Sequence, residues 1–525
     1  MEQQTDTLNS KNTLVRSTML LIILTVLSKL FGFGREMTQA YFFGANIITD
    51  AYLVAMTIPT VLFLAVSGAI NNVFVPVYDR FRTQGRDKAL VIKFALIGLG
   101  FCVLVFIIPV FLNTKFAVRL FAPQLREEGI ALAAGMLRIL IFIVFFRLFS
   151  AIGTAVLHVN RNFLVPGMVG IPYNLAIMGF SFFLAGSMGI NALVWGTFAG
   201  VGIQFFILLP WLTRIKMGGT IRTKVSDGLK EIAFLLPPIL MGSLAGQAKT
   251  MTDRIFASGL AEGSISFLNY ANRIKELPVG LLIVTVITVL YPTLVSHANN
   301  QQWRQYRSIV ANALNTMTFL LLPVIAGIAI LALPLTQLIF MRGEFDMAAA
   351  ESTAYALRFY SFHILGAMVY RLMVKAHYAV KDTKTPLYAM LISVSLNIVL
   401  NIIFIPFFAH GGLALATAIA TLTSGLFMFR RLRKRIGPVL GNNILQDMGK
   451  SALATLTMAF LCLVLYIVLQ PYIPASFLGK AAVTGGIVVV CAGLYFALAW
   501  FLKISAMDEA MKLVRGLKSK IGWGK

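Results

Sequence analysis

The chain has 525 residues, of which 58% are hydrophobic and only 12% are charged, and its mean hydropathy is +0.83. Soluble domains contain about 25% charged residues, so this composition excludes a soluble globular protein and indicates an integral membrane protein. The net charge of +25 would suggest a nucleic-acid partner in a soluble protein, but in a membrane protein the distribution of the charge along the chain decides its meaning.

Apolar runs of roughly 20 residues, the length that spans a bilayer as a helix, recur along nearly the whole chain. We count fourteen such runs, so the sequence predicts an all-α polytopic membrane protein with about fourteen transmembrane helices. The runs are centred near Ile23, Leu62, Phe101, Phe142, Leu175, Gly202, Leu240, Ile283, Leu321, Leu365, Leu396, Ile419, Phe460 and Val489.

The basic residues are concentrated in alternate loops. If the N-terminus is cytoplasmic, the inner loops include the basic segments 80–88, 214–224 and 430–435, and the polar C-terminal tail adds further lysines. The outer loops then contain only Lys115, Arg119, Arg126, Arg342 and Lys480. By the positive-inside rule we expect a multi-pass membrane protein with both termini in the cytoplasm. The loops contact anionic membrane lipids in this interpretation, and no nucleic acid is expected.

The first apolar run contains two basic residues, Lys29 and Arg35, on either side of Gly32. Charge at membrane depth is costly and indicates a functional site unless a partner neutralises it. The glycines between the two residues can bend the helix and let both side chains reach one cavity. Two plainer readings stay open: Lys29 extends to the membrane surface, and Arg35 forms a structural ion pair with Glu36.

Asp50 begins the second predicted helix, where a carboxylate suits either a cap or a functional role. Further basic residues, Lys249, Arg254, Arg273 and Lys275, lie in or beside the seventh and eighth runs. Arg273 and Glu276 are three residues apart and can neutralise each other. A cavity lined mainly by cations suits an anion, and a phosphate-bearing anion fits best.

A second polar group lies deep in later runs. Asp253 is the only carboxylate within the seventh run, and Asn397 and Asn401 share a helix face at the spacing i, i+4. With Thr417 of the twelfth run, these oxygen atoms form a candidate Na⁺ site. Hydrogen bonding between helices explains the two asparagines equally well.

Two stretches of the chain repeat with an offset of roughly 216 to 223 residues. The segments from Phe43 to Pro76 and from Ser258 to Pro292 share a glycine-containing turn and a long helix with a central proline. An offset of six helices is even, so both halves have the same orientation, as in parallel-repeat transporters. We predict an N-lobe over residues 1–222 (helices 1–6), a C-lobe over 223–436 (helices 7–12), and two additional helices with a basic tail over 437–525.

Motifs for nucleotide and metal chemistry are missing. The sequence contains no GxxxxGK[ST] loop, no HExxH and no CxxC pair. Cys102, Cys462 and Cys491 lie in apolar runs and indicate neither disulfides nor a metal site. We therefore expect a transporter that is neither an enzyme nor driven by ATP.

Several segments resemble one known family. They are 28–35 (SKLFGFGR), 43–45 (FGA), 49–52 (TDAY), 72–76 (NVFVP), 269–273 (NYANR) and 381–386 (KDTKTP). This pattern resembles the MurJ (MviN) family of the multidrug/oligosaccharidyl-lipid/polysaccharide superfamily, and the similarity runs along the whole chain. The resemblance implies two six-helix lobes with an added helix pair, and a lipid II flippase of the bacterial cytoplasmic membrane that is active in peptidoglycan synthesis.

The resemblance also implies roles for particular residues. The family's cavity arginines correspond to Lys29, Arg35 and Arg273, its essential aspartate to Asp50, and Glu276 belongs to the helix-eight signature. Lys29 departs from the usual arginine, and Phe63 and Leu64 occupy the place where some members have a basic pair. The sodium ligands of some members correspond to Asp253, Asn397, Asn401 and Thr417.

The implied substrate is the undecaprenyl-diphosphate-linked muropeptide, lipid II, which a monomer would carry from the inner to the outer leaflet by alternating access through a cationic cavity. The polyprenyl tail would lie in a groove on the last two helices. Na⁺ is a possible coupling ion, and no other cofactor is expected. The open alternatives are a flippase for another polyprenyl-diphosphate-linked glycan and a cation-coupled multidrug antiporter, although an antiporter for cationic drugs should have an acidic cavity.

Overall fold

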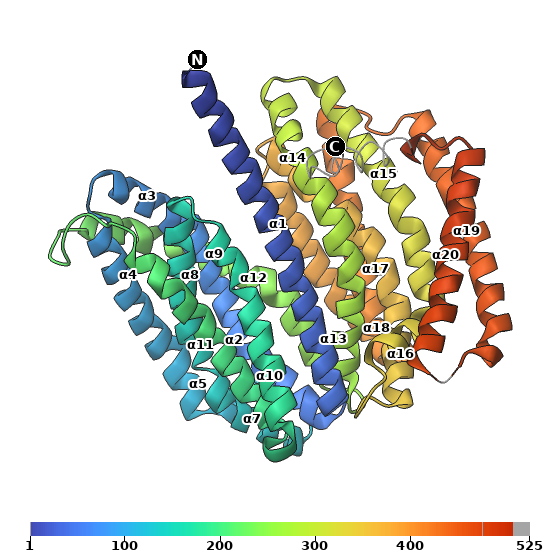
Figure 1. Ribbon diagram of the computed structural model, residues 1–525, viewed down its shortest axis with the longest axis horizontal. Coiled ribbons are helices and arrows are strands. Elements are labelled where there is room, and N and C mark those ends of the chain that lie inside the picture. Colours follow the sequence, from blue (N-terminus) through green and yellow to red (C-terminus); the bar gives the residue numbers. More distant parts are fainter. Residues whose placement is uncertain (1, 475, 508–525) are drawn as a thin grey trace. The chain divides into compact units, whose positions relative to one another are not determined.

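The computed structural model describes residues 2–474 and 476–507 of the chain, which are helical apart from short turns. They divide into two compact units (Figure 1). Unit 1 is Met1–Ser266 with Arg342–Phe345, and unit 2 is Phe267–Met341 with Asp346–Lys525. This division by packing assigns α12 to unit 1. It does not test the predicted lobes, which were defined by the sequence repeat, so those lobes stay a prediction.

Unit 1 contains twelve helices, two π-helical segments and the first residues of α13. Their bounds are α1 (Glu2–Phe43), α2 (Ile47–Ala69), η1 (Ile70–Phe74), α3 (Val75–Thr83), α4 (Asp87–Cys102), η2 (Val103–Ile107), α5 (Ile108–Leu112), α6 (Thr114–Phe121), α7 (Glu127–Leu140), α8 (Ile143–Val159), α9 (Leu164–Met168), α10 (Gly170–Met188), α11 (Asn191–Thr213) and α12 (Ser226–Ala257). Within this unit α2 packs against α7, α8 and α12, and α1 packs against α10.

Unit 2 contains the remaining elements. They are α13 (Ser264–Pro278), which begins in unit 1, η3 (Val279–Ile283), α14 (Val284–Asn299), α15 (Trp303–Ile330), α16 (Ala332–Phe340), α17 (Met347–Ala379), α18 (Lys384–Ile436), α19 (Asn442–Leu469), the 3₁₀ turn η4 (Gln470–Tyr472) and α20 (Phe477–Phe501). Here α17 packs against α18 and α15, and α19 packs against α15 and α20.

The predicted all-α membrane fold is confirmed, whereas the number of spans stays a prediction. In the described part of the chain nine helices are long and apolar enough to cross a membrane, or up to eleven if each of two bent pairs forms one span. One of the nine, α18, contains two of the predicted runs, because its backbone turns at Ala409. Thirteen predicted centres lie within helices, and Phe142 lies at the 43° bend between α7 and α8.

The backbone itself supports the predicted repeat. Residues with positive φ recur 216 to 220 positions apart, in the pairs Gly44 and Gly263, Gly85 and Gln301, Arg161 and Lys381, Gly189 and Ala409, and Gly219 and Gly437. The turns at Arg161 and Lys381 also contain equivalent hydrogen bonds. Asn162 N donates to Leu157 O in the first turn and Asp382 N donates to His377 O in the second, each at 2.9 Å. Positive φ is rare outside glycine, so these matches indicate two copies of one fold.

One detail of the predicted repeat differs in the structure. The sequence also pairs Gly189 with Gly412 and so predicts a tight glycine turn at Gly412 in the second copy, but the chain turns at Ala409, where φ is 46° and ψ is −129°. Gly189 has nearly the same conformation, with φ of 54° and ψ of −139°. Glycine favours this conformation because it lacks a Cβ atom, so a search for glycines selects the wrong residue in the second copy.

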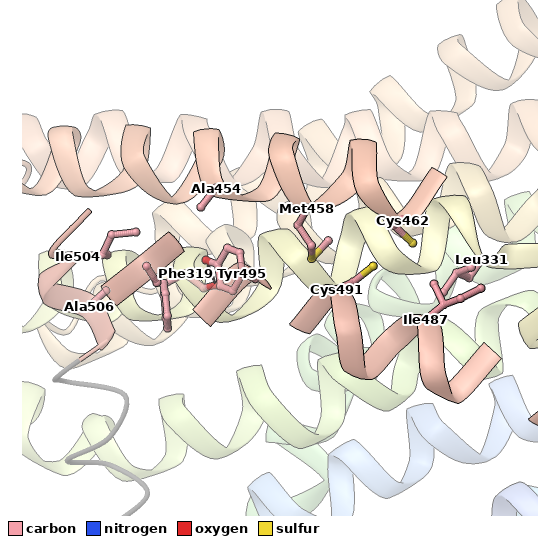
Figure 2. Packing of buried hydrophobic residues seen from close by; sticks show 11 residues of the cluster. Phe319, Leu331, Ala454, Met458, Cys462, Ile487, Cys491, Tyr495, Ile504 and Ala506 are labelled. Carbon is pink, nitrogen blue, oxygen red and sulfur yellow. Dashed lines mark hydrogen bonds between the residues drawn. The ribbon is translucent and has the colours of Figure 1, made fainter. Parts of the chain in front are cut away.

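The last two helices share an apolar core with the rest of unit 2 (Figure 2). Cys462 and Met458 of α19 and Cys491 and Tyr495 of α20 are buried together with Phe319 of α15. The Tyr495 hydroxyl donates to the Phe319 carbonyl oxygen at 2.7 Å. Because helices in a membrane are held together by van der Waals packing and interhelical hydrogen bonds, these contacts show that α19 and α20 contribute to the packing of unit 2.

Candidate functional site

Arg35 lies near the C-terminal end of α1, with its side chain only 17% exposed. Its Nη2 atom donates to Glu36 Oε1 at 2.5 Å, and Nη1 donates to the Tyr173 hydroxyl of α10 at 3.2 Å. The buried Nε atom has no hydrogen-bond partner among the described residues. Buried donors are almost always paired, so Arg35 combines a structural ion pair with one donor that an anion can use.

Arg147 of α8 is a second arginine in the same region, and the sequence analysis did not select it. Its Nη1 atom donates to Thr60 Oγ1 of α2 at 3.4 Å, and its guanidinium lies 5.3 Å from the ring centre of Phe63. It also interacts electrostatically with Arg35 and Tyr173. A basic side chain of α8 therefore lies beside Phe63 of α2.

Lys29 and Asp50 have different surroundings from Arg35. Lys29 is exposed on α1. Asp50 is buried, and both of its carboxylate oxygens accept hydrogen bonds at the start of α13: Gly263 N at 2.9 Å, Ser266 N at 2.8 Å and Ser266 Oγ at 2.5 Å. Asn46 is the residue that caps α2. Asp50 therefore caps another helix, where its charge meets the positive end of the helix dipole.

In unit 2, the basic and acidic residues of α13 meet α17. Glu276 forms ion pairs with Lys275 at 3.8 Å and with Arg371 of α17 at 3.6 Å. The buried Lys275 ammonium lies 4.4 Å from the ring centre of Tyr360. Arg273 is exposed. Glu276 is thus shared by two cations, and Arg371 is a further basic residue that sequence reasoning missed.

Three of the four proposed sodium ligands lie together in unit 2. Asn397 Nδ2 donates to Thr417 Oγ1 at 3.2 Å, and Asn401 Nδ2 donates to Asn397 Oδ1 at 3.3 Å. All three residues are buried, and Asn401 Oδ1 has no hydrogen-bond partner among the described residues. The hydrogen bonds among these three residues match the prediction of hydrogen bonding between helices. The Asn401 oxygen without a partner is also suited to binding a cation. Asp253 belongs to unit 1, where it interacts electrostatically with Lys249.

The turn between α17 and α18 is organised by Asp382. This carboxylate accepts hydrogen bonds from Lys384 N at 3.1 Å, Thr385 N at 3.0 Å and Thr385 Oγ1 at 2.7 Å, and contacts His377 Nδ1 at 3.1 Å. Burial raises the pKa of Asp382, but the hydrogen bonds from Thr385 and His377 lower it more, and the resulting pKa is about 2 instead of 3.8. The motif that contains Asp382 is therefore a helix-capping turn.

This turn predicts a pH dependence of stability. Because the pKa of Asp382 is lower in the folded protein, its contribution is complete above pH 3.8 and is lost as the pH falls toward 2. Asp382→Ala should lower the melting temperature at neutral pH, as expected for loss of a cap worth about 1 kcal/mol. The melting temperatures of both proteins, measured from about pH 7 down to about pH 2, should converge at the acidic end. A constant difference between the two curves would contradict this role.

Two hollows lie outside these groups. An apolar hollow of about 640 Å³ in unit 1 is lined by residues of α4, η2, α5, α8 and α11 and the turn at Phe142, including Phe111 and Phe146. A more polar one of about 440 Å³ in unit 2 is lined by Glu351, Arg358 and His410, among others. Neither hollow includes a residue that the sequence analysis selected as substrate-binding.

Comparison with known proteins gives one consistent result. A family model described as "Lipid II flippase MurJ" matches residues 39–482. The chain is 27% identical over 501 residues to "Probable lipid II flippase MurJ" of Buchnera aphidicola subsp. Schizaphis graminum, covering 94% of this chain and 97% of that protein. It is 30% identical over 434 residues to the "Probable lipid II flippase MurJ" of Haemophilus influenzae, covering 78% and 84%.

Solved structures agree with these matches. The chain is similar to "Lipid II flippase MurJ, inward closed conformation", with a TM-score of 0.76, 26% identity, and coverage of 91% of this chain and 99% of that one. It is also similar to the inward-facing conformation of a multidrug resistance MATE family transporter of the MOP superfamily, with a TM-score of 0.65, 14% identity, and coverage of 80% and 98%. The second likeness concerns the fold alone.

Proposed function

The chain belongs to the MurJ family of lipid II flippases, and from this premise we propose how its own residues hold and move the substrate. Family membership makes the protein a multi-pass inner-membrane transporter, not an enzyme, with lipid II as its substrate. Our proposal is that arginines of the chain bind the diphosphate, and that the protein then exposes it to the outer leaflet by alternating access.

The observation that carries this proposal is the excess of cations in unit 1. Arg35 and Arg147 interact with each other and with Tyr173, and Arg35 forms an ion pair with the carboxylate of Glu36. A guanidinium offers a planar fork of donors that matches a phosphate. Lys29, Asp50, Arg273 and Glu276 stay proposals as substrate contacts, and Asp50 also caps α13.

The test is leaflet-resolved measurement of lipid II in bacteria depleted of their own flippase and supplied with this protein. We expect the protein to restore lipid II in the outer leaflet and to restore growth. A flippase for another polyprenyl-linked glycan would leave lipid II in the inner leaflet, which would contradict the proposal. The basic composition of the unit 1 group disfavours an antiporter for cationic drugs.

We further propose that the protein acts as a monomer with both termini in the cytoplasm, which the charge of the loops favours. The polyprenyl tail would run along α19 and α20. Gly485, Gly486 and Gly493 of α20 support this placement, because a Cβ atom added at any of them meets nothing within 4 Å. The open space leaves room for a chain on this face.

Gly486→Trp therefore tests the tail groove without crowding the fold. The new side chain would occupy the open face of α20, so we expect transport to fall while the protein level and melting temperature stay near those of the wild type. Gly186→Trp in α10 is the matched control, since a Cβ atom at that exposed glycine also meets nothing within 4 Å. Full transport by Gly486→Trp would rule out a groove at this position.

We also propose Na⁺ as a coupling ion bound by Asn397, Asn401 and Thr417 of unit 2; Asp253 of unit 1 stays a prediction as a fourth ligand. The orphaned Asn401 oxygen supports such a site, but neutral amide oxygens attract a cation weakly, so the affinity should be low.

Thermal stability measured in NaCl and in KCl tests the sodium proposal. NaCl should raise the melting temperature of the wild type more than KCl does, because an ion that binds only the folded state stabilises it. Asp253→Asn and Asn401→Ala should each reduce this difference. If NaCl and KCl change the melting temperature equally in all three proteins, the sodium proposal is wrong and these residues serve only hydrogen bonding between helices.

A further inference from the structure

Arg147 has surroundings that a structural role alone does not explain. It lies a few residues after the bend between α7 and α8, a pair that together is long enough to cross a membrane. A charged group inside a membrane is retained when it has a partner or a function. None of the described carboxylates lies within ion-pair distance of Arg147. Its side chain contacts the Thr60 hydroxyl and the Phe63 ring, and it interacts electrostatically with two phenols, those of Tyr52 and Tyr173, and with Arg35.

The contacts of Arg147 hold the guanidinium in place without using all of its donors. The hydrogen bond to Thr60 uses one Nη atom, and Phe63 lies beside the guanidinium at a distance typical of a cation–π contact. Thr60 and Phe63 are three residues apart in α2, so one face of that helix supports the side chain. A guanidinium has five donors, so donors remain for a ligand.

The charge of the group also points to an anion. Arg35 shares Tyr173 with Arg147 and is neutralised by Glu36 at 2.5 Å, which leaves the positive charge of Arg147 uncompensated within this group. Two like charges near each other repel in a low-dielectric environment. An anion with several oxygens would remove this repulsion and take donors from both arginines.

We propose that Arg147 is a phosphate-binding residue of unit 1 and holds the diphosphate of the substrate together with Arg35. This inference rests on the proposed function and adds a specific residue of α8 to it. Tyr173, which contacts Arg35 and lies close to Arg147, positions the two side chains. The ligand chemistry is a polyprenyl diphosphate, and the sugar and peptide of the substrate are not needed for this contact.

The experiment compares binding to purified full-length variants. Undecaprenyl diphosphate and lipid II are the probes, phosphatidylcholine is the lipid control, and stabilisation against heat is the readout. Arg147→Gln should weaken the stabilisation by both probes by about tenfold in the concentration required, as expected for loss of a charged hydrogen bond. Arg147→Lys should lose less, because it keeps the charge but not the fork. Arg138→Gln is the matched control, because Arg138 is an exposed arginine of the same bent pair.

A variant with the arginine moved to a neighbouring position distinguishes a loss of binding from a loss of folding. The double variant Arg147→Gln with Phe63→Arg returns a guanidinium to the same place from α2, so it should recover part of the binding and of the growth in flippase-depleted cells. If wild type binds lipid II and Arg147→Gln binds it equally well, the inference is wrong and the proposed function stands. If wild type binds lipid II no better than phosphatidylcholine, the proposed function fails and takes this inference with it.

Discussion

Arg35→Ala should abolish growth in cells that depend on this protein, while the variant still reaches the membrane at a normal level. Arg35 is mostly buried and donates to Glu36 at 2.5 Å and to Tyr173 at 3.2 Å, and its Nε donor has no partner among the described residues. In our account this guanidinium binds the substrate phosphate. Its loss removes charged hydrogen bonds worth about 1.5 to 3 kcal/mol each.

A structural explanation of the same result must be excluded. Removing Arg35 takes away the ion-pair partner of Glu36, whose side chain is 3% exposed, and the loss of one partner of a buried ion pair costs about 3 to 5 kcal/mol. The double variant Arg35→Ala with Glu36→Gln removes both charges and should fold, yet it should still fail to support growth. Normal growth of the double variant would assign Arg35 to the ion pair alone. Lys29→Arg should be tolerated, since it keeps the charge of an exposed residue.

Arg273→Ala should also abolish growth without loss of the protein from the membrane. Arg273 is exposed on α13, beside Glu276, whose carboxylate is shared by Lys275 and Arg371. Because the ion pairs of Glu276 include two other cations, removal of Arg273 should leave this carboxylate compensated and the fold intact. The loss should therefore appear in transport and not in stability.

Two control variants accompany Arg273→Ala: one keeps the charge at this position, and the other removes an arginine elsewhere. Arg273→Lys keeps the charge without the planar fork and should retain part of the activity. Arg304→Ala, at an exposed arginine near the start of α15, should leave growth unchanged. Growth of Arg273→Ala at the wild-type rate would contradict a role of α13 in substrate binding.

The membrane class, the all-α fold and the family could be predicted from the sequence because they rest on long patterns. A run of about 20 apolar residues is sufficient to identify a helix that spans a bilayer. The repeat was also visible, although its turn at Ala409 was not, since the conformation glycine favours is adopted there by alanine. The bend beside Phe142 interrupts a run that has no proline or glycine at that point.

Contacts between distant residues could not be predicted in the same way. Asp50 caps α13 across 213 to 216 residues of chain, which no local pattern records. Asn397 and Asn401 are four residues apart on one helix, so their hydrogen bond was within reach of sequence reasoning. Arg147 did have a signal, a single charge inside a phenylalanine-rich run, but the three residues that explain it come from α2 and α10.

In our account, the protein moves lipid II across the membrane while its arginines bind the diphosphate of the lipid. The most direct measurement is the transfer of fluorescent lipid II between leaflets of vesicles that contain the purified protein. We predict transfer by the wild type and by Arg138→Gln, and transfer no faster than in protein-free vesicles for Arg35→Ala with Glu36→Gln. Transfer by that double variant at the wild-type rate would contradict the account.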